Sequence, residues 1–290
     1  MKPAVFEHYA PTTLEAALSL LDEFGSDAKI ISGGQSLIPM MNMRLARPKI
    51  LIDINRVEEL NYIRIADSEI QIGGLTRHYQ VEHSREIEQA CPLITEGMKL
   101  IGHAQIRSRG TIGGSVVHAD PTAELPVILR TLGASVTLAS IEGVRTVPTD
   151  EFFLTYLTTT IEPNEILISV HIPRPAANTG FAIDEFTLRK GDFAIVLAAA
   201  SITLDDQGRV TAAALGLGGV DGVPVLLNEV TEGLIGYPPD RDRIEACCRI
   251  ISELVDPESD VHASAEYRRD LCVTYGRRVL ERAAQRAYRQ

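Results

Sequence analysis

The sequence lacks the two glycine motifs by which nucleotide phosphates are most often recognised. No Gly-x-Gly-x-x-Gly follows a predicted strand, and no Gly-x-x-x-x-Gly-Lys-Ser/Thr occurs in the 290 residues. Neither a Rossmann dinucleotide site nor a P-loop is therefore indicated. A nucleotide ligand would have to bind to another scaffold.

Cysteine is also scarce. The four cysteines are Cys91, Cys247, Cys248 and Cys272, and their spacing fits neither a zinc site nor an iron-sulfur cluster. We expect buried or unreactive thiols. The seven histidines are scattered without the spacing of a metal-binding helix face, so we predict no metal site, and any redox role would require an organic cofactor.

A basic excess and long apolar runs are missing as well. Acidic residues outnumber basic ones by 39 to 28, which gives a net charge of -11 and argues against nucleic acid or an anionic membrane as partner. No stretch approaches 18 uninterrupted apolar residues, so no membrane insertion is expected. The first residues lack the apolar centre of a signal peptide, which predicts a cytoplasmic location.

Two glycine pairs flanked by hydroxyl residues are the most informative features present. They are Ser32-Gly33-Gly34-Gln35-Ser36 and Thr111-Ile112-Gly113-Gly114-Ser115. A Gly-Gly step lets the backbone approach a ligand closely and lets consecutive N–H groups converge on an anion. One such pair alone is more often a tight turn, but two suggest loops that grip a diphosphate or an extended ligand from both sides.

The surroundings of the first pair strengthen this interpretation. Residues 29–31 read as a strand that enters the loop, 37–44 as a helical turn and 49–54 as the next strand. A phosphate held there would lie near a helix N-terminus, where unpaired N–H groups favour negative charge.

The remaining pattern predicts alternating helices and hairpins. Thr12 and Glu15 form an expected capping box for a helix that ends at Gly25, and Asp120 with Pro121 is expected to start a helix that runs to Gly133. Expected helices are 79–90, 95–101, 241–254 and one from about 263; expected strands or hairpins are 63–72, 134–147, 165–172, 184–188, 196–204 and 210–217. Residues 173–180 are the expected linker. The arginines of the last helix are expected on a solvated or partner-facing side.

Four motifs in this order resemble a known family. They are the segments 33–39 (Gly-Gly-x-Ser-Leu-Ile-Pro), 109–114 (Arg-Gly-Thr-Ile-Gly-Gly), 120–124 (Asp-Pro-x-x-Glu) and 191–193 (Gly-Asp-Phe). Together they resemble the FAD-binding medium subunit of molybdenum hydroxylases, a family that includes xanthine dehydrogenase and aerobic carbon monoxide dehydrogenase.

The resemblance implies an α+β fold. It consists of a two-subdomain FAD-binding domain of the vanillyl-alcohol-oxidase/PCMH type at 1–175, divided at about 57, and a C-terminal α+β domain at 176–290 with a three-stranded antiparallel sheet and helices. FAD would extend between the two subdomains. The implied cofactor-binding residues are Ser32, Gly33, Gly34, Gln35, Ser36, Leu37, Ile101, Thr111, Gly113, Gly114, Ser115, Glu124, Asp192 and Phe193; no catalytic side chain is implied.

Four positions depart from the family pattern. Ser32 and Gln35 stand where Ala and His are frequent, Ser115 stands where Asn is frequent, and Phe193 stands where carbon monoxide dehydrogenase has Tyr. Gln35 and Ser115 keep hydrogen-bonding groups, and Phe193 keeps a flat face for stacking but loses the phenol. An ordinary core aromatic is the alternative interpretation of Phe193.

The resemblance implies an electron-transfer subunit of a heterotrimer. Electrons would come from 2Fe-2S clusters of a small partner, after substrate oxidation at a molybdopterin cofactor on a large partner, in a dimer of heterotrimers. Two alternatives remain open: a stand-alone FAD-dependent oxidoreductase of the vanillyl-alcohol-oxidase-like fold that acts on a small organic substrate, and a flavin-free scaffold.

Overall fold

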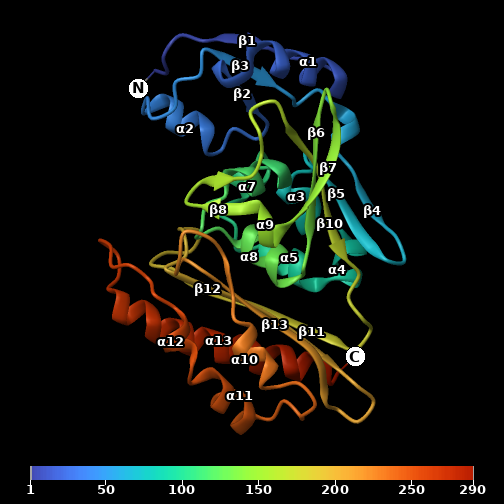
Figure 1. Ribbon diagram of the computed structural model, residues 1–290, viewed down its shortest axis with the longest axis vertical. Coiled ribbons are helices and arrows are strands. Elements are labelled where there is room, and N and C mark those ends of the chain that lie inside the picture. Colours follow the sequence, from blue (N-terminus) through green and yellow to red (C-terminus); the bar gives the residue numbers. More distant parts are fainter. Residues whose placement is uncertain (1, 290) are drawn as a thin grey trace.

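The computed structural model describes residues 2–289 and arranges them in three tiers along its long axis (Figure 1). The first tier, which we call the first lobe, is a parallel sheet in the order β1-β3-β2 with two helices. Its elements are β1 (Glu7–Tyr9), α1 (Leu14–Phe24), a 3-10 turn (Gly25–Asp27), β2 (Ala28–Ile31), α2 (Leu37–Asn42) and β3 (Ile50–Asp53). This confirms the predicted strand, glycine loop, helix and strand unit.

The start of α1 differs by one residue from the expectation. Thr13, rather than Thr12, caps the helix, and its hydroxyl accepts a hydrogen bond from the N–H of Ala16 at 3.2 Å. Glu15 therefore lies in the first turn without completing a capping box. The helix has one apolar face, on which Ala17, Leu18 and Leu21 are buried against the sheet.

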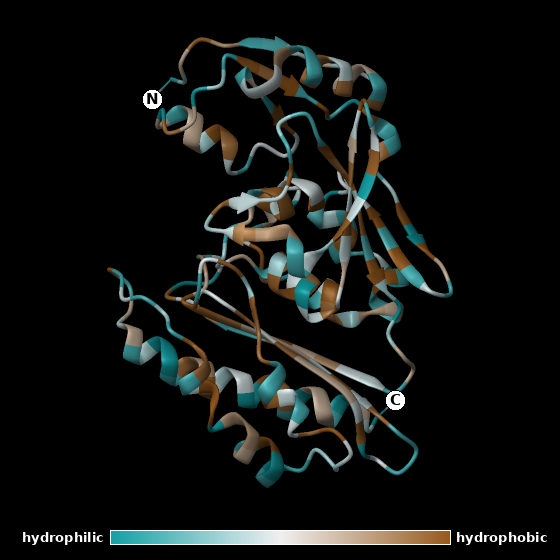
Figure 2. Ribbon diagram, in the orientation of Figure 1, coloured by the Kyte–Doolittle hydropathy of each residue, from teal (hydrophilic) through white to brown (hydrophobic). Residues whose placement is uncertain are grey.

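The second tier, the second lobe, is an antiparallel sheet in the order β4-β5-β10-β6-β7, partly enclosed by short helices. Its strands are β4 (Ile63–Ile65), β5 (Glu69–Gly73), β6 (Ser135–Ser140), β7 (Gly143–Pro148) and β10 (Ile166–Pro173), with a 3-10 turn at Glu58–Leu60 before them and a separate pair of β8 (Phe153–Thr155) and β9 (Thr158–Thr159). Both predicted hairpins are confirmed. Hydrophobic and hydrophilic residues alternate along β4 in Figure 2, as the sequence pattern requires.

The helices of the second lobe are shorter than expected. They are α3 (His78–Glu82), α4 (Arg85–Ala90), α5 (Pro92–Met98), α6 (Ala104–Arg107), α7 (Ile112–His118), α8 (Glu124–Thr131) and α9 (Thr149–Phe152). The expected helix 79–90 is broken because Ser84 caps a new helix by accepting from the N–H of Ile87. Asp120 does not start a helix. Its carboxylate accepts from the N–H and hydroxyl of Thr122, which closes a turn, and α8 begins only at Glu124.

The third tier is an antiparallel sheet in the order β11-β12-β13-β14. Its elements are β11 (Thr179–Phe186), β12 (Val196–Leu204), β13 (Val210–Gly218), β14 (Val225–Leu226), α10 (Asn228–Glu232), α11 (Arg241–Cys248), α12 (Ile251–Leu254) and α13 (Ala265–Ala287). The sheet contains the three expected strands and, beside β13, a fourth strand of two residues, β14. The strand β11 begins inside the expected linker, and the expected helix 241–254 is divided in two. In Figure 1, α13 runs across one face of this sheet.

The other face of the third-tier sheet packs on the second lobe. Phe181 and Ile183 of β11 and Leu197 of β12 belong to one hydrophobic cluster with Met98 of α5 and Ile128 of α8. The two parts of the chain therefore share a core across the linker, and burial of apolar surface holds them together.

The expected solvated side of α13 is wrong for Arg268. Arg268 is 6% exposed and donates to the carbonyls of Ile195 and Gly219 and to the carboxylate of Asp260. Arg278 and Arg282 both pair with Asp184, and Arg286 pairs with Glu96 of α5. These side chains tie the helix to the sheet and to the second lobe, which the sequence pattern did not indicate. No helix within residues 2–289 has the length and apolar character needed to cross a membrane.

Replacing Arg268 by Met should destabilise the protein by about 3 kcal/mol, because two buried carbonyls and Asp260 lose their partner. Urea unfolding measures the effect. The neighbouring variant Arg269→Met is the control, since Arg269 pairs with an exposed carboxylate, that of Asp256, and should cost less than about 1 kcal/mol. Equal losses in both variants would contradict the assignment of Arg268 to the core.

Candidate cofactor site

The two glycine segments meet where the first and second lobes join. The hydroxyls of Ser32 and Thr111, which are 79 residues apart in sequence, lie 2.9 Å from one another. Gly33 lies directly on the backbone of the second lobe: a β carbon there would be 2.5 Å from the carbonyl oxygen of Arg109 and 2.9 Å from the Cα of Gly110. Only glycine permits this approach without displacing one lobe from the other.

The first segment is a loop with a run of available donors. The main-chain N–H groups from Gly33 through Leu37 donate to no other group within residues 2–289. Gly34 has a φ of +69°, and the side-chain amide of Gln35 donates to the carbonyl of Gly33 at 2.9 Å, which folds the loop. Because unpaired backbone N–H groups bind anions, these five consecutive donors fit a phosphate or diphosphate.

The second segment is not a loop, so that expectation is wrong. Thr111 caps α7, and Gly113 and Gly114 lie in the first turn of this helix. The N–H groups of the turn are engaged: Ile112 donates to Thr76, Gly113 donates to Gly74 at 2.8 Å, and Gly114 donates to the Thr111 hydroxyl. The sequence could not show this, because the carbonyl acceptors of residues 74 and 76 belong to a distant part of the chain.

The role of Gly114 is again one of close approach. A β carbon on Gly114 would lie 2.9 Å from the Ser32 hydroxyl and 2.7 Å from that of Thr111. A side chain at this position would therefore push the two lobes apart. Ser115, the next residue, is partly exposed beside Gly114.

A cluster of charged and polar groups that the sequence motifs did not indicate surrounds this junction. Burial, followed by the nearby charge of Arg109, lowers the pKa of Arg77, and Asp53 opposes the effect. Two arginines close enough to repel give this region positive charge, which suits an anionic ligand. Arg109 belongs to the motif at 109–114, but no motif contains Arg77 or Asp53, so no local signal could have found those two residues.

His78 contacts the backbone of the second segment through its ring and its main-chain N–H. It is 4% exposed, its Nε2 lies 3.0 Å from the carbonyl oxygen of Thr111, and its main-chain N–H donates to Gly110. Burial lowers the pKa of His78 to about 4, so the ring is neutral at pH 7. Since a carbonyl only accepts, Nε2 must carry the proton, and the buried Nδ1 has no partner among the described residues.

A second group of predicted site residues gathers around Ile101. Gly191, with a φ of +85°, lies against the second lobe, where a β carbon on it would be 3.0 Å from the carbonyl oxygen of Gly102. This contact brings the connection from β11 to β12, which contains Asp192 and Phe193, against the connection from α5 to α6, which contains Ile101. Phe193 is 67% exposed, so the core-aromatic alternative is wrong.

Glu124 is buried at the start of α8. It is 9% exposed, and burial, with smaller effects from Glu185 and Asp120, raises its pKa to about 8. Glu185, which the sequence reasoning missed, has its pKa raised to about 7 by burial, and its Oε2 has no partner among the described residues. Glu124 is thus protonated at pH 7 and able to donate a hydrogen bond. Strongly shifted acids of this kind are typical of functional sites.

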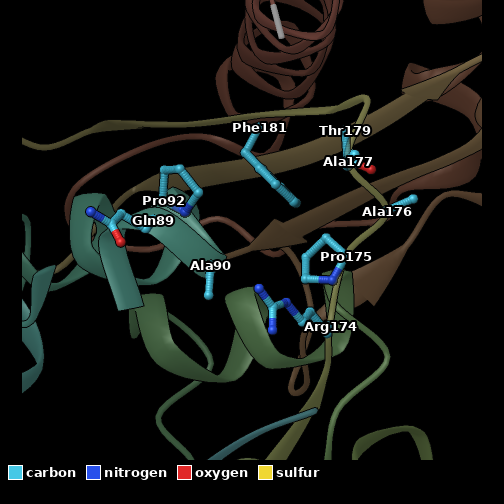
Figure 3. A pocket seen from close by; sticks show the side chains of 9 residues that line it. All are labelled: Gln89, Ala90, Pro92, Arg174, Pro175, Ala176, Ala177, Thr179 and Phe181. Carbon is cyan, nitrogen blue, oxygen red and sulfur yellow. The ribbon is translucent and has the colours of Figure 1, made fainter. Parts of the chain in front are cut away.

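One cavity of the molecule does not belong to this site. A cavity of about 250 Å³ lies between Gln89, Pro92 and the linker, with Arg174 and Phe181 at its edges (Figure 3), and none of the predicted site residues line it.

Across residues 2–289, no three His, Cys, Asp or Glu side chains are grouped as a metal site requires. Burial raises the pKa of three of the thiols, those of Cys91, Cys248 and Cys272, to about 12.

Comparison with known proteins identifies the class. Residues 4–175 match the family described as "FAD binding domain in molybdopterin dehydrogenase", and residues 181–283 match the "CO dehydrogenase flavoprotein C-terminal domain". The fold and the site therefore define an FAD-binding flavoprotein that serves as part of an oxidoreductase. The chain belongs to the family of FAD-binding medium subunits of molybdenum hydroxylases.

Individual relatives extend over nearly the whole chain. The chain is 42% identical to 6-hydroxypseudooxynicotine dehydrogenase complex subunit alpha of Paenarthrobacter nicotinovorans, covering 99% of this chain and 97% of that protein. It is 33% identical to the carbon monoxide dehydrogenase medium chain of Afipia carboxidovorans, covering 99% of each. Among solved structures, carbon monoxide dehydrogenase from Hydrogenophaga pseudoflava superimposes with a TM-score of 0.95 at 34% identity, covering 99% of each chain.

Replacing Glu124 by Gln should stabilise the FAD-free protein at pH 8 by about 4 kcal/mol and have little effect at pH 4. The raised pKa means that the folded state holds a proton that the unfolded chain releases above about pH 4.5. The stability of the native chain is therefore full below that pH and is lost as pH rises through 8.

Urea unfolding at the two pH values measures this difference. Glu151→Gln is the control, because Glu151 is exposed and should show no such dependence. A Glu124→Gln variant that tracks the native chain at both pH values would show that Glu124 is not a buried, protonated acid.

Proposed function

We propose that this chain is the FAD-carrying electron-transfer subunit of a heterotrimeric molybdenum hydroxylase. In this proposal it receives electrons from 2Fe-2S clusters of a small partner subunit, and a large partner with a molybdopterin cofactor oxidises the substrate. The chain then passes the electrons to an external acceptor. The observation that carries the proposal is the run of unengaged N–H donors from Gly33 through Leu37, held by the second lobe beside two arginines.

The diphosphate of FAD is assigned to these donors. Hydrogen bonds to charged groups contribute about 1.5–3 kcal/mol each, so several of them retain the cofactor without a covalent link. The hydroxyls of Ser32, Ser36, Thr111 and Ser115 are further possible donors around the same junction. Gly113 and Gly114 contribute by letting the lobes approach, since their N–H groups are already bonded.

The isoalloxazine end of FAD is assigned to the group around Ile101. The exposed ring of Phe193 offers a flat face for stacking, and Asp192 lies next to it. Glu124, being protonated, could donate a hydrogen bond. Bound FAD supplies the redox chemistry, and the residues of this chain bind it, orient it and adjust its electronic surroundings.

Several observations support the assignment of the other cofactors to partner chains. A 2Fe-2S cluster is held by four thiolates, and three of the four cysteines here are buried in the cores as protonated thiols. Relatives of this chain are subunits of dehydrogenases named for different compounds, including caffeine and carbon monoxide. This supports the proposal that another subunit selects the substrate. A dimer of heterotrimers in the cytoplasm is part of the proposal.

The purified chain should take up about one FAD per molecule. Gly33→Val should raise the Kd for FAD at least tenfold, a loss of about 1.4 kcal/mol or more in binding free energy. A valine there would meet the carbonyl of Arg109 and separate the lobes. Quenching of flavin fluorescence during titration measures the Kd, and thermal unfolding of each variant shows whether it folds.

Ala212→Val, at an exposed position of β13, is the matched control and should bind FAD like the native chain. The proposal fails if the native chain does not bind FAD. Native-like affinity of the Gly33→Val variant would instead remove the glycine segment from the site.

A further inference from the structure

Arg77 spans the junction between the two lobes. It belongs to the second lobe, between β5 and α3, and its Nη2 donates to Oδ1 of Asn55, just beyond β3 of the first lobe, at 2.6 Å. Its Nη1 donates to the carbonyl of Arg109, and its backbone pairs with that of Thr111 in an isolated antiparallel bridge. One side chain therefore reaches both halves of the candidate site.

Asn55 continues the connection to the glycine loop. Its Nδ2 donates to the carbonyl of Ser32 at 2.8 Å and also lies 2.6 Å from the carboxylate of Asp53. The Ser32 hydroxyl then contacts that of Thr111 at 2.9 Å. Polar contacts thus join Arg77 to Asn55, Asn55 to Ser32 and Ser32 to Thr111, and the backbone bridge between Thr111 and Arg77 closes the circuit, which we call the interlobe ring.

We propose that Arg77 is a positioning residue for the diphosphate: through the interlobe ring it fixes the spacing between the donor loop of the first lobe and the first turn of α7. The inference rests on the proposed function, and it adds a residue and a mechanism that the glycine motifs do not contain. The ring fixes the carbonyl of Ser32 and so the direction in which the following N–H groups point.

The charges around Arg77 support this role over a purely structural one. The Arg77 guanidinium is half-buried next to Arg109, and among residues 2–289 Asp53 provides the opposing charge. Such an arrangement is unfavourable without an anion, and a bound diphosphate would relieve the repulsion. A link needed only for folding would not require two neighbouring cations.

The geometry also explains why the residue is arginine. The two acceptors, Asn55 Oδ1 and the Arg109 carbonyl, are bonded by different nitrogens of one planar guanidinium. Lysine carries the same charge on a single nitrogen that cannot reproduce the fork. Arg77→Lys therefore keeps the charge but breaks the ring, and Arg77→Gln removes both.

The test titrates FAD and ADP into the full-length, FAD-stripped chain and its variants. We expect Arg77→Lys and Arg77→Gln to raise the Kd for FAD and the Kd for ADP by a similar factor of about ten, because both ligands contain the diphosphate. FAD bound at saturation should keep the native visible spectrum, since the flavin end is untouched. Arg145→Lys is the matched control: Arg145 joins Glu165 and the Thr160 carbonyl elsewhere in the second lobe, and FAD binding should not change.

A double-mutant cycle tests the ring itself. In the Asn55→Ala background, Arg77→Lys should cost clearly less FAD affinity than in the native chain, because the contact is already lost. Additive losses would overturn the ring, as would native affinity in Arg77→Lys. An altered flavin spectrum would also overturn the proposal, by showing a general disturbance. If the native chain binds no FAD, the proposed function itself fails, which is a separate result.

Discussion

The close contact between the backbone of Gly33 and that of Arg109 and Gly110 is the constraint on which the site depends. It brings two lobes together at a distance that no side chain permits, and the Ser32 and Thr111 hydroxyls meet beside it. Beside this contact, the N–H groups of residues 33–37 donate to no group within residues 2–289. An anion can bind here because these backbone N–H groups are not used in internal hydrogen bonds.

Groups that reduce the stability of the folded chain are located around the two halves of the site. Arg77 lies near Arg109, Glu124 and Glu185 are buried acids, and His78 is buried with a nitrogen that has no partner within residues 2–289. The fold compensates elsewhere, through the core that the third-tier sheet shares with α5 and α8 and through arginine contacts such as those of Arg268. Such a division is expected where function requires locally unfavourable arrangements.

Local patterns were sufficient to predict the strand, loop, helix and strand unit of the first lobe and both hairpins, because period-2 and period-3.6 patterns depend on neighbours in sequence. The conformation at Gly113 was not predictable, since its N–H partner is Gly74. The late start of α8 follows from a local turn between Asp120 and Thr122 that the pattern did not reveal. The burial of Arg268 depends on tertiary contacts. Arg77 and Asn55 carry no motif, and only the fold brings them to Ser32.

Amide hydrogen exchange tests most directly whether FAD binds through these free donors. Without FAD, the N–H groups of residues 33–37 should exchange fast, whereas those of Ile112, Gly113 and Gly114 should already be protected by their internal bonds. Saturation with FAD should slow exchange in 33–37 and leave 112–114 nearly unchanged. Protection that appears at 112–114 while 33–37 continue to exchange freely would contradict the account.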